Sequence, residues 1–442
     1  MLRTDRPSTF RRPMALSGAV ALGAALLLAP SGTAVAAPNR VLGYIANNGG
    51  GVSVLDTATD TLTSTLSDSN GDSPYGVGVA FDGARGYVTN VRDDTLTVID
   101  TPTNTIDAVV PVGDGPAGVV VSPGGSHVYV SNYLAGTVSV VDAATLTATE
   151  TIPVGPNADG VALTPDGTRL YVAHDVVGAG TVSVVDTTTN TEITEIPTGN
   201  TPTAVAVTPD GTKLLVVNKF SNNVAVVSVA GNAVVGTIPV SFTPHGIAIS
   251  PDGSRAFVTN SEGDTLSAVD VNAMAPVAAV PVGDRPIGVA LTPDGAKAYV
   301  TNFNSGTVSI VDTASLSVVG TLAVGTNPVG VAIHAVPPAP TKLVAGHASL
   351  QLRLLGFTVR GMNAKLTESH TGRPVVGKTV AFRTVKGHPL CTAVTNSVGK
   401  ATCNADVPLL VGLATLLRGY TAAYPGDVTH GPSVSHGTIG LL

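Results

Sequence analysis

Few residues in this sequence have the types and spacing that chemistry requires, and the most familiar pattern lies in the wrong local setting. Residues 372–379 read Gly-Arg-Pro-Val-Val-Gly-Lys-Thr, which is the spacing of a loop that cradles nucleotide phosphates. Such a loop works only between a strand and a helix whose N-terminus faces the phosphates. Here Val380, Ala381 and Phe382 continue a strand pattern instead. We therefore expect no nucleotide binding.

Metal chemistry is suggested by a single acidic loop. Asp68, Asn70 and Asp72 alternate along this loop, and alternating oxygen ligands suit Ca²⁺. The glycine is misplaced and the distal glutamate is missing relative to an EF-hand, so a plain solvated loop is the favoured alternative. We expect no cofactor, and Ca²⁺ at this loop is the alternative that stays open.

The composition predicts a chain that buries a core and is not mostly helical. Charged residues make up 12% of the 442 positions and hydrophobic residues 43%, with 50 Gly, 31 Pro and no Trp. A chain this apolar is not disordered, and glycine and proline at this density exclude a mostly helical protein.

The first 36 residues are typical of an export signal. Arg3, Arg6, Arg11 and Arg12 precede an apolar stretch, and Ala34-Val35-Ala36 has the small-x-small pattern of a cleavage site. General secretion is favoured over twin-arginine export. We expect a secreted or envelope-associated protein with no transmembrane span after cleavage.

A repeat of about 42 residues organises most of the chain beyond this signal. A turn of the form Pro-x-Gly recurs seven times, with one copy starting at Ala158 and one lacking the glycine. Each unit has four short alternating segments, which is the pattern of β-strands, and the fourth segment carries a proline that suits an exposed edge. Such units predict the blades of a β-propeller.

The ends of the repeat array predict how the ring closes. The chain begins with the second, third and fourth strands of a unit and finishes with a lone first strand near residues 330–334. These four strands complete a seventh blade. We therefore predict a seven-bladed propeller over residues 37–335, and we call the face that carries the Pro-x-Gly turns the top face.

The recurring Tyr-Val-Thr-Asn, Pro-Asp-Gly and Val-Val-Asp-Thr segments resemble the YVTN family of propeller repeats, over about residues 41–335. The resemblance implies a secreted or surface protein of bacteria or archaea, and the family has no single shared activity.

A different pattern begins after a proline-rich linker at residues 336–341. Residues 342–442 have seven strand-like segments without the 42-residue period, which suits a small β-sandwich. Residues 371–380 and 420–427 resemble bacterial Ig-like repeat domains, and this resemblance implies a spacer or adhesive module. Cys391 and Cys403, the only cysteines, flank a turn at residues 396–399, so in an exported protein we expect a disulfide across a hairpin.

The charge is unevenly distributed along the chain, and its distribution limits the kinds of partner that we expect. Residues 37–340 hold nine Lys and Arg against 26 Asp and Glu, whereas residues 341–442 hold ten against three. The acidic part argues against nucleic acid as a partner. The basic part has ordinary solvated charges or docks onto an anionic cell-wall polymer or onto the acidic part.

Ligand recognition is expected at the axial mouth of the top face, because loops there vary while the bottom turns are nearly constant. The candidate residues are Tyr75, Arg92, Tyr133, Asp159, His174, Lys219, Phe220, His245, Glu262 and Phe303. No catalytic motif occurs, so a non-enzymatic binding or scaffold protein is favoured. The alternatives are an extracellular enzyme of the lactone hydrolase or lyase type, with its site at the same mouth, and a purely structural envelope component.

Overall fold

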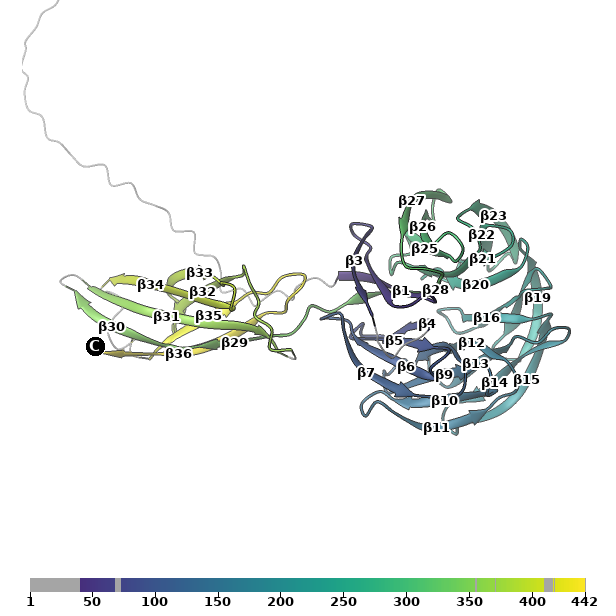
Figure 1. Cartoon of the computed structure of the whole chain (residues 1–442), viewed down its shortest axis with the longest axis horizontal. Helices are drawn as coiled ribbons and strands as arrows, with labels where there is room; N and C mark the ends of the chain where they lie inside the picture. Colours follow the sequence, from purple (N-terminus) through teal and green to yellow (C-terminus); the bar gives the residue numbers. More distant parts are fainter. Residues whose placement is uncertain are drawn as a thin grey trace, which may run out of the picture. The chain divides into compact units, whose positions relative to one another are not determined.

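The computed structural model describes residues 40–67, 73–353, 356–369, 371–408, 416 and 418–441. The predicted signal segment 1–36 and the acidic loop with Asp68, Asn70 and Asp72 lie outside the described residues. The architecture is all-β (Figure 1). Within the described ranges, no helix is long and apolar enough to cross a membrane.

Seven four-stranded antiparallel sheets form the blades of a propeller, as the repeats predict. Six blades are made from consecutive strands: the first from β4 (Pro74–Val79), β5 (Arg85–Asn90), β6 (Thr95–Asp100) and β7 (Thr105–Pro111), and the second from β8 (Pro116–Val121), β9 (His127–Asn132), β10 (Thr137–Asp142) and β11 (Thr147–Pro153). The third consists of β12 (Ala158–Leu163), β13 (Arg169–His174), β14 (Gly180–Asp186) and β15 (Thr191–Gly199), and the fourth of β16 (Pro202–Val207), β17 (Lys213–Asn218), β18 (Asn223–Ser228) and β19 (Ala233–Pro239). The fifth consists of β20 (Pro244–Ile249), β21 (Arg255–Asn260), β22 (Thr265–Asp270) and β23 (Ala275–Pro281), and the sixth of β24 (Pro286–Leu291), β25 (Lys297–Asn302), β26 (Thr307–Asp312) and β27 (Ser317–Ala323).

The seventh blade joins the two ends of the repeat array. Its strands are β28 (Pro328–Val336), β1 (Arg40–Asn47), β2 (Val52–Asp56) and β3 (Thr61–Leu66), in that order across the sheet. β28 pairs antiparallel with β1, so that Arg40 lies opposite Val336. The predicted closure of the ring is therefore confirmed (Figure 1).

The Thr and Asn of the Tyr-Val-Thr-Asn segments hold the blades together. Thr89 accepts a hydrogen bond from Gly76 N–H and donates one to the carbonyl of Ala117 in the next blade, at 2.7 Å. Thr259 and Thr301 make the same link to their next blades. The buried Asn at the end of the segment donates to hydroxyls on the adjacent third strand, as Asn132 does to Ser139. The motif is therefore structural.

Glycine in the Pro-x-Gly turn permits close approach of the inner strands. A Cβ on Gly76 would lie 2.2 Å from the carbonyl oxygen of Ala117, and one on Gly288 would lie 2.3 Å from that of Val329. Both oxygens belong to the backbone of the next blade, which cannot move aside as a flexible side chain could. The blades thus pack backbone to backbone around the axis.

The bottom of the propeller is built from turns capped by aspartate. Asp252 accepts hydrogen bonds from the Ser250 hydroxyl and from the N–H and hydroxyl of Ser254, which lower its pKa to about 2. Asp142, at the end of a third strand, caps the following turn through the N–H groups of Ala144 and Thr145. The Asp residues after the third strands therefore serve as turn caps.

Apolar side chains fill the space between blades. Tyr171 and Val184 of one blade are fully buried in the same cluster as Leu214 and Val227 of the next. The core is thus a set of layers between facing sheets, and the strands position the side chains that surround the axis.

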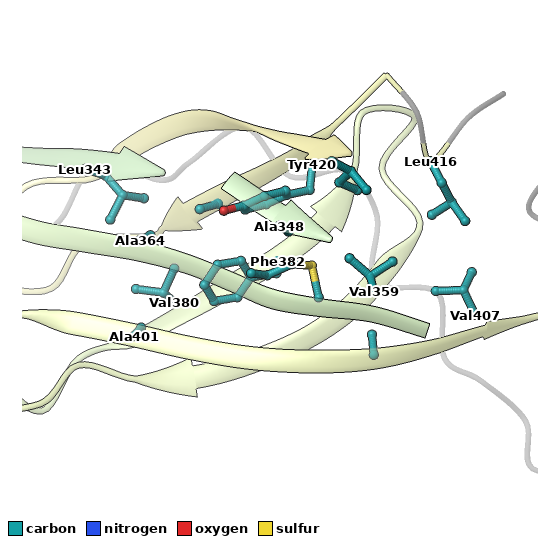
Figure 2. Close-up of a cluster of buried hydrophobic side chains, with 14 of the residues drawn as sticks. Leu343, Ala348, Val359, Ala364, Val380, Phe382, Ala401, Val407, Leu416 and Tyr420 are labelled. Atoms are coloured by element: carbon teal, nitrogen blue, oxygen red, sulfur yellow. The ribbon is translucent and has the colours of Figure 1, made fainter. Parts of the chain in front are cut away.

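The C-terminal strands form a separate set. They are β29 (Thr341–Ala345), β30 (His347–Arg353), β31 (Gly356–Glu368), β32 (Thr379–Thr384), β33 (Pro389–Val394), β34 (Lys400–Pro408), β35 (Tyr420–Tyr424) and β36 (Ser433–Leu441). The sequence predicts seven strands, and the structure adds β29, which directly follows the prolines assigned to the linker. The core between the strands includes Val359, Val380, Phe382 and Tyr420 (Figure 2).

Cys391 and Cys403 are joined by a disulfide, with their Cα atoms 6.5 Å apart. The connection is not the predicted hairpin. β33 pairs with β32, whereas β34 pairs with β31, so the bond joins two strands that are not hydrogen-bonded partners. The turn at residues 396–399 carries the chain from one strand pair to the other, and the disulfide fixes this crossing.

Candidate functional site at the top of the propeller

Two sets of side chains surround the axial mouth. The first, which we call the inner ring, is the middle residue of each Pro-x-Gly turn: Tyr75, Ala117, Asp159, Thr203, His245, Ile287 and Val329. The second, the outer ring, is the residue that directly follows each second strand: Asn48, Val91, Tyr133, Asp175, Lys219, Ser261 and Phe303. Both sets follow from the repeat, because each blade contributes one residue to each ring.

Backbone bonds fix the outer ring. In every blade the N–H of the outer-ring residue donates to the carbonyl of the residue that precedes the first strand, as Asp175 does to Asn157 and Lys219 to Thr201. That preceding residue has a positive φ in all seven blades, for example 53° at Asn157 and 62° at Thr201. The sharp corner thus brings each second-strand end against the start of its own first strand.

Hydroxyl groups of the blades fix the inner ring. Ser131 donates to the backbone carbonyl of Asp159, and Thr203 donates to that of His245 at 3.0 Å. The backbone carbonyls of Asp159 and His245 are therefore each held by a hydroxyl of the preceding blade.

Residues of both rings line one cavity of about 470 Å³. The lining residues are Asn48, Ser73, Tyr75, Val91, Arg92, Gly115, Ala117, Tyr133, Leu134, Asp159, Asp175, Lys219 and His245. Six predicted site residues are thus brought together, namely Tyr75, Arg92, Tyr133, Asp159, Lys219 and His245. The volume is that of a pocket for a small molecule.

Asp159 is the most unusual group in this pocket. It is 7% exposed, and within the described part of the chain its carboxyl group has no hydrogen-bond partner. Burial, with a further contribution from the charge of Asp175, raises the pKa of Asp159 to about 7, although Lys219 acts in the opposite direction. Burial also raises the pKa of Asp175 itself. Asp159 therefore exchanges its proton near neutral pH.

Three further titratable groups of the pocket, His245, Tyr75 and Tyr133, are uncharged at neutral pH. Burial and the positive charges of Lys219 and Arg285 lower the pKa of His245 to about 4. The Asp159 carboxylate and burial raise the pKa of the Tyr75 hydroxyl well above its usual value, and burial raises that of Tyr133. At neutral pH the pocket therefore offers an uncharged imidazole and two phenol groups beside a carboxyl that can donate or accept.

Three predicted residues lie on the top loops outside the cavity lining. The ammonium group of Lys219 lies 5.4 Å from the centre of the Phe220 ring, which is 50% exposed. Glu262 accepts a hydrogen bond from the Thr243 hydroxyl at 2.8 Å. Phe303 packs against the guanidinium of Arg285, 4.9 Å from its ring centre. Phe220, Glu262 and Phe303 thus contact neighbouring residues of the top loops and do not line the cavity.

His174 does not face the cavity. It occupies the position of the motif asparagine in its blade and is 2% exposed, with its ring nitrogens 2.7 Å from the Ser183 hydroxyl and 3.0 Å from the Pro156 carbonyl. The ring therefore replaces the asparagine side chain as a structural link. The next residue, Asp175, lines the cavity instead.

His174 and Asp175 belong to the same variable top loop, and of the two only His174 is among the candidate residues, although the sequence holds a signal for Asp175. It follows the second strand directly, in the same place as Tyr133 and Lys219. Aligning the repeats on that strand end would have selected it and would have placed His174 among the buried motif positions. Among the described residues, no group of three or more His, Cys, Asp or Glu could hold a metal ion.

Comparisons with family models match two parts of the propeller. The model of the choice-of-anchor I domain matches residues 119–283, and the model of the cytochrome D1 heme domain matches residues 38–174. Each covers less than half of the chain. No curated protein matches the sequence significantly.

Solved structures share the fold at low sequence identity. A functionally unknown protein from Desulfotomaculum acetoxidans is 19% identical, with a TM-score of 0.59, over 67% of this chain and 99% of its own. A "putative 6-phosphogluconolactonase" from Bacteroides uniformis is 18% identical, with a TM-score of 0.58, over 67% and 100%. Hydrazine synthase from Kuenenia stuttgartiensis is 23% identical, with a TM-score of 0.54, over 58% and 88%. The chain therefore has the fold of a seven-bladed β-propeller.

Proposed function

We propose that this chain is an extracellular propeller protein that recognises a small polar ligand, or a polar group of a partner, in the cavity on its top face. The observation that carries the proposal is Asp159, a buried carboxyl without a protein hydrogen-bond partner at the wall of that cavity. Its carboxyl is open to the cavity, so a ligand there can form a hydrogen bond with a group that is otherwise largely removed from bulk water. Tyr75 and Tyr133 add aromatic surface for the same ligand.

A binding screen tests this proposal. Neutral sugars, sugar acids, amines and amino acids are added to the protein at pH 7, and any compound that raises the melting temperature is titrated by calorimetry. We expect Asp159→Asn to weaken binding by about tenfold or more, because hydrogen bonds to charged groups are among the stronger ones. Glu262→Gln is the matched control, since Glu262 is a carboxylate on the same face outside the cavity. A compound that binds both variants equally, or a screen without a bound compound, would contradict the proposal.

A second candidate is an acid–base enzyme of the lactone hydrolase or lyase type at the same cavity. One observation favours it: Asp159, with its pKa near 7, lies in the same pocket as the neutral imidazole of His245, and groups of this kind suit proton transfer. The likeness to the Bacteroides uniformis structure is of fold alone.

An assay of sugar lactone hydrolysis, in which the released protons are measured, distinguishes the two candidate functions. An enzyme should exceed the rate in buffer, and Asp159→Asn should reduce the catalysed rate by about a hundredfold or more. Glu262→Gln should retain it. If the hydrolysis rate with the protein equals the rate in buffer alone, the enzyme candidate is excluded and ligand binding is the function that stays.

The cellular setting supports a role outside the cell. The segment 1–36 has the pattern of an export signal, and residues 119–283 match the model of the choice-of-anchor I domain. We assign the repeats to the YVTN type, and residues 342–442 to an Ig-like spacer or adhesive domain stabilised by the Cys391–Cys403 disulfide. The pocket would then be presented at or beyond the cell surface.

A further inference from the structure

Three lysines share one face of the C-terminal sheet. Lys365 on β31 lies directly opposite Lys400 on β34 and opposite Val344 on β29. Lys342 on β29 lies opposite Thr367, two residues along β31 from Lys365, so Lys342 and Lys365 are diagonal neighbours. All three lysines are exposed, whereas the alternating neighbours Leu343, Ala364, Leu366 and Ala401 are buried in the core. The lysines therefore project from the outer face.

This juxtaposition is unfavourable within the protein alone. Like charges directly opposite each other on neighbouring strands destabilise a sheet. Among the described residues, none of the three lysines has an ion-pair partner. An external anion could neutralise them.

The three acidic side chains of this part of the chain are engaged elsewhere. Asp427 forms an ion pair with Lys378 at 2.6 Å, and Glu368 lies 3.5 Å from His430. Asp406 accepts a hydrogen bond from the Thr358 hydroxyl at 2.6 Å. The net positive charge of residues 341–442 is therefore left on the basic side chains that have no such partner.

We propose that the outer face of β29, β31 and β34 binds a phosphodiester-linked anionic polymer of the cell envelope through Lys342, Lys365 and Lys400. Lysine is a compact point charge that commonly binds phosphate. The exposed Thr402, which lies next to Lys400 on the same face, adds a hydroxyl donor. The amide of Asn363 opposite it already donates to the carbonyls of His347 and Gly361. The outward residues of this cluster include no aromatic side chain on which bases could stack, which argues against single-stranded nucleic acid.

The proposal is tested by measuring the affinity of residues 37–442 for a glycerol phosphate oligomer at low salt concentration. The variant with Lys342→Gln, Lys365→Gln and Lys400→Gln should bind at least about tenfold more weakly, and binding to the parent should weaken as salt rises. The control variant carries Arg383→Gln, Lys386→Gln and Arg418→Gln. These residues are also exposed, and their removal changes the net charge equally, but they lie outside the three strands.

Each outcome of this comparison either supports or overturns the proposal. Loss of binding in the face variant with retention in the control supports the proposal, as does a melting temperature of the face variant at or above that of the parent, because repulsion is relieved. Equal loss in both variants would show attraction by total charge alone and would overturn it. Equal binding of polygalacturonate, tighter binding of oligothymidylate, no binding of the oligomer, or a face variant that melts several degrees lower would also overturn it.

Discussion

Asp159 and His245 respond in opposite ways to the same burial beside Lys219. Burial favours the uncharged form of each group, which is the protonated carboxyl for Asp159 and the deprotonated imidazole for His245. For Asp159 the folded state holds a proton that the unfolded chain releases, so its contribution to stability falls as pH rises from about 4 to 7. For His245 the folded state lacks a proton that the unfolded chain binds, so its contribution falls as pH drops from 6.5 to about 4.

The two contributions should offset each other between about pH 5 and 8 in the parent protein. In Asp159→Asn the stability lost through His245 on acidification is no longer offset by Asp159. We therefore expect the free energy of unfolding of this variant to fall relative to the parent as pH drops across that range. His245→Asn should do the reverse and gain relative stability on acidification. Each change should be about 1–3 kcal/mol.

Urea unfolding at about pH 5 and about pH 8 measures both changes. Glu262→Gln serves as the control, because its carboxylate lies outside the cavity. Two pocket variants whose stability followed the parent at both pH values would show that these groups titrate normally, and an unusual carboxyl at this position would be disproved.

At the scale of the element, the first strand of each blade is limited by the carbonyl of its neighbour. In the fourth blade Ala204 of β16 takes the place of the glycine, while Gly160 in the preceding blade would meet the Thr203 carbonyl at 2.6 Å if it carried a Cβ. The small residue is therefore a packing requirement between blades.

Gly288→Ala should destabilise the propeller by about 1–3 kcal/mol, because its Cβ would lie 2.3 Å from the backbone oxygen of Val329 in the closing strand. Gly124→Ala is the control, since a Cβ there meets nothing within 4 Å. Urea midpoints of the two variants are compared at neutral pH. A loss at Gly124 as large as that at Gly288 would mean that the penalty reflects glycine in general and not contact between blades.

The strands could be predicted from sequence because each copy repeats the same turn chemistry, such as the Asp and Gly of the bottom turns. The site was harder. Tyr75 and His245 follow from their place in the repeat. The proximity of Asp159 and Asp175, which belong to one blade, to Lys219 of the next blade depends on how the two blades are arranged around the axis. His174 misled the prediction because a histidine in a structural asparagine position has the side-chain type of a ligand-binding residue. The path of β33 and β34 was missed because a short turn between strands usually forms a hairpin.

At the scale of the whole molecule, one blade joins residues about 290 positions apart in sequence, and this blade completes the ring. β28 pairs with β1 from Arg40 to Asn47, and its residues also pack beside the first strands of both flanking blades. Lys297 and Tyr299 of the sixth blade bind Asp60 of the closing blade, with 2.6 Å between the Lys297 ammonium and the carboxylate. Closure is thus made by a strand on the inside and by an ion pair toward the outside.

A chain that ends at Thr326 should therefore be much less stable than one that ends at Pro340, because it lacks all of β28. Without that strand the inner edge of β1 is unpaired, and apolar side chains such as Leu42 and Tyr44, now fully buried, gain access to water. Thermal melts of residues 37–326 and 37–340 measure the difference, and both chains lack the C-terminal strands, so that part cannot cause it. Equal melting temperatures would show that the ring is stable when open, and closure by the two chain ends would then have no energetic role.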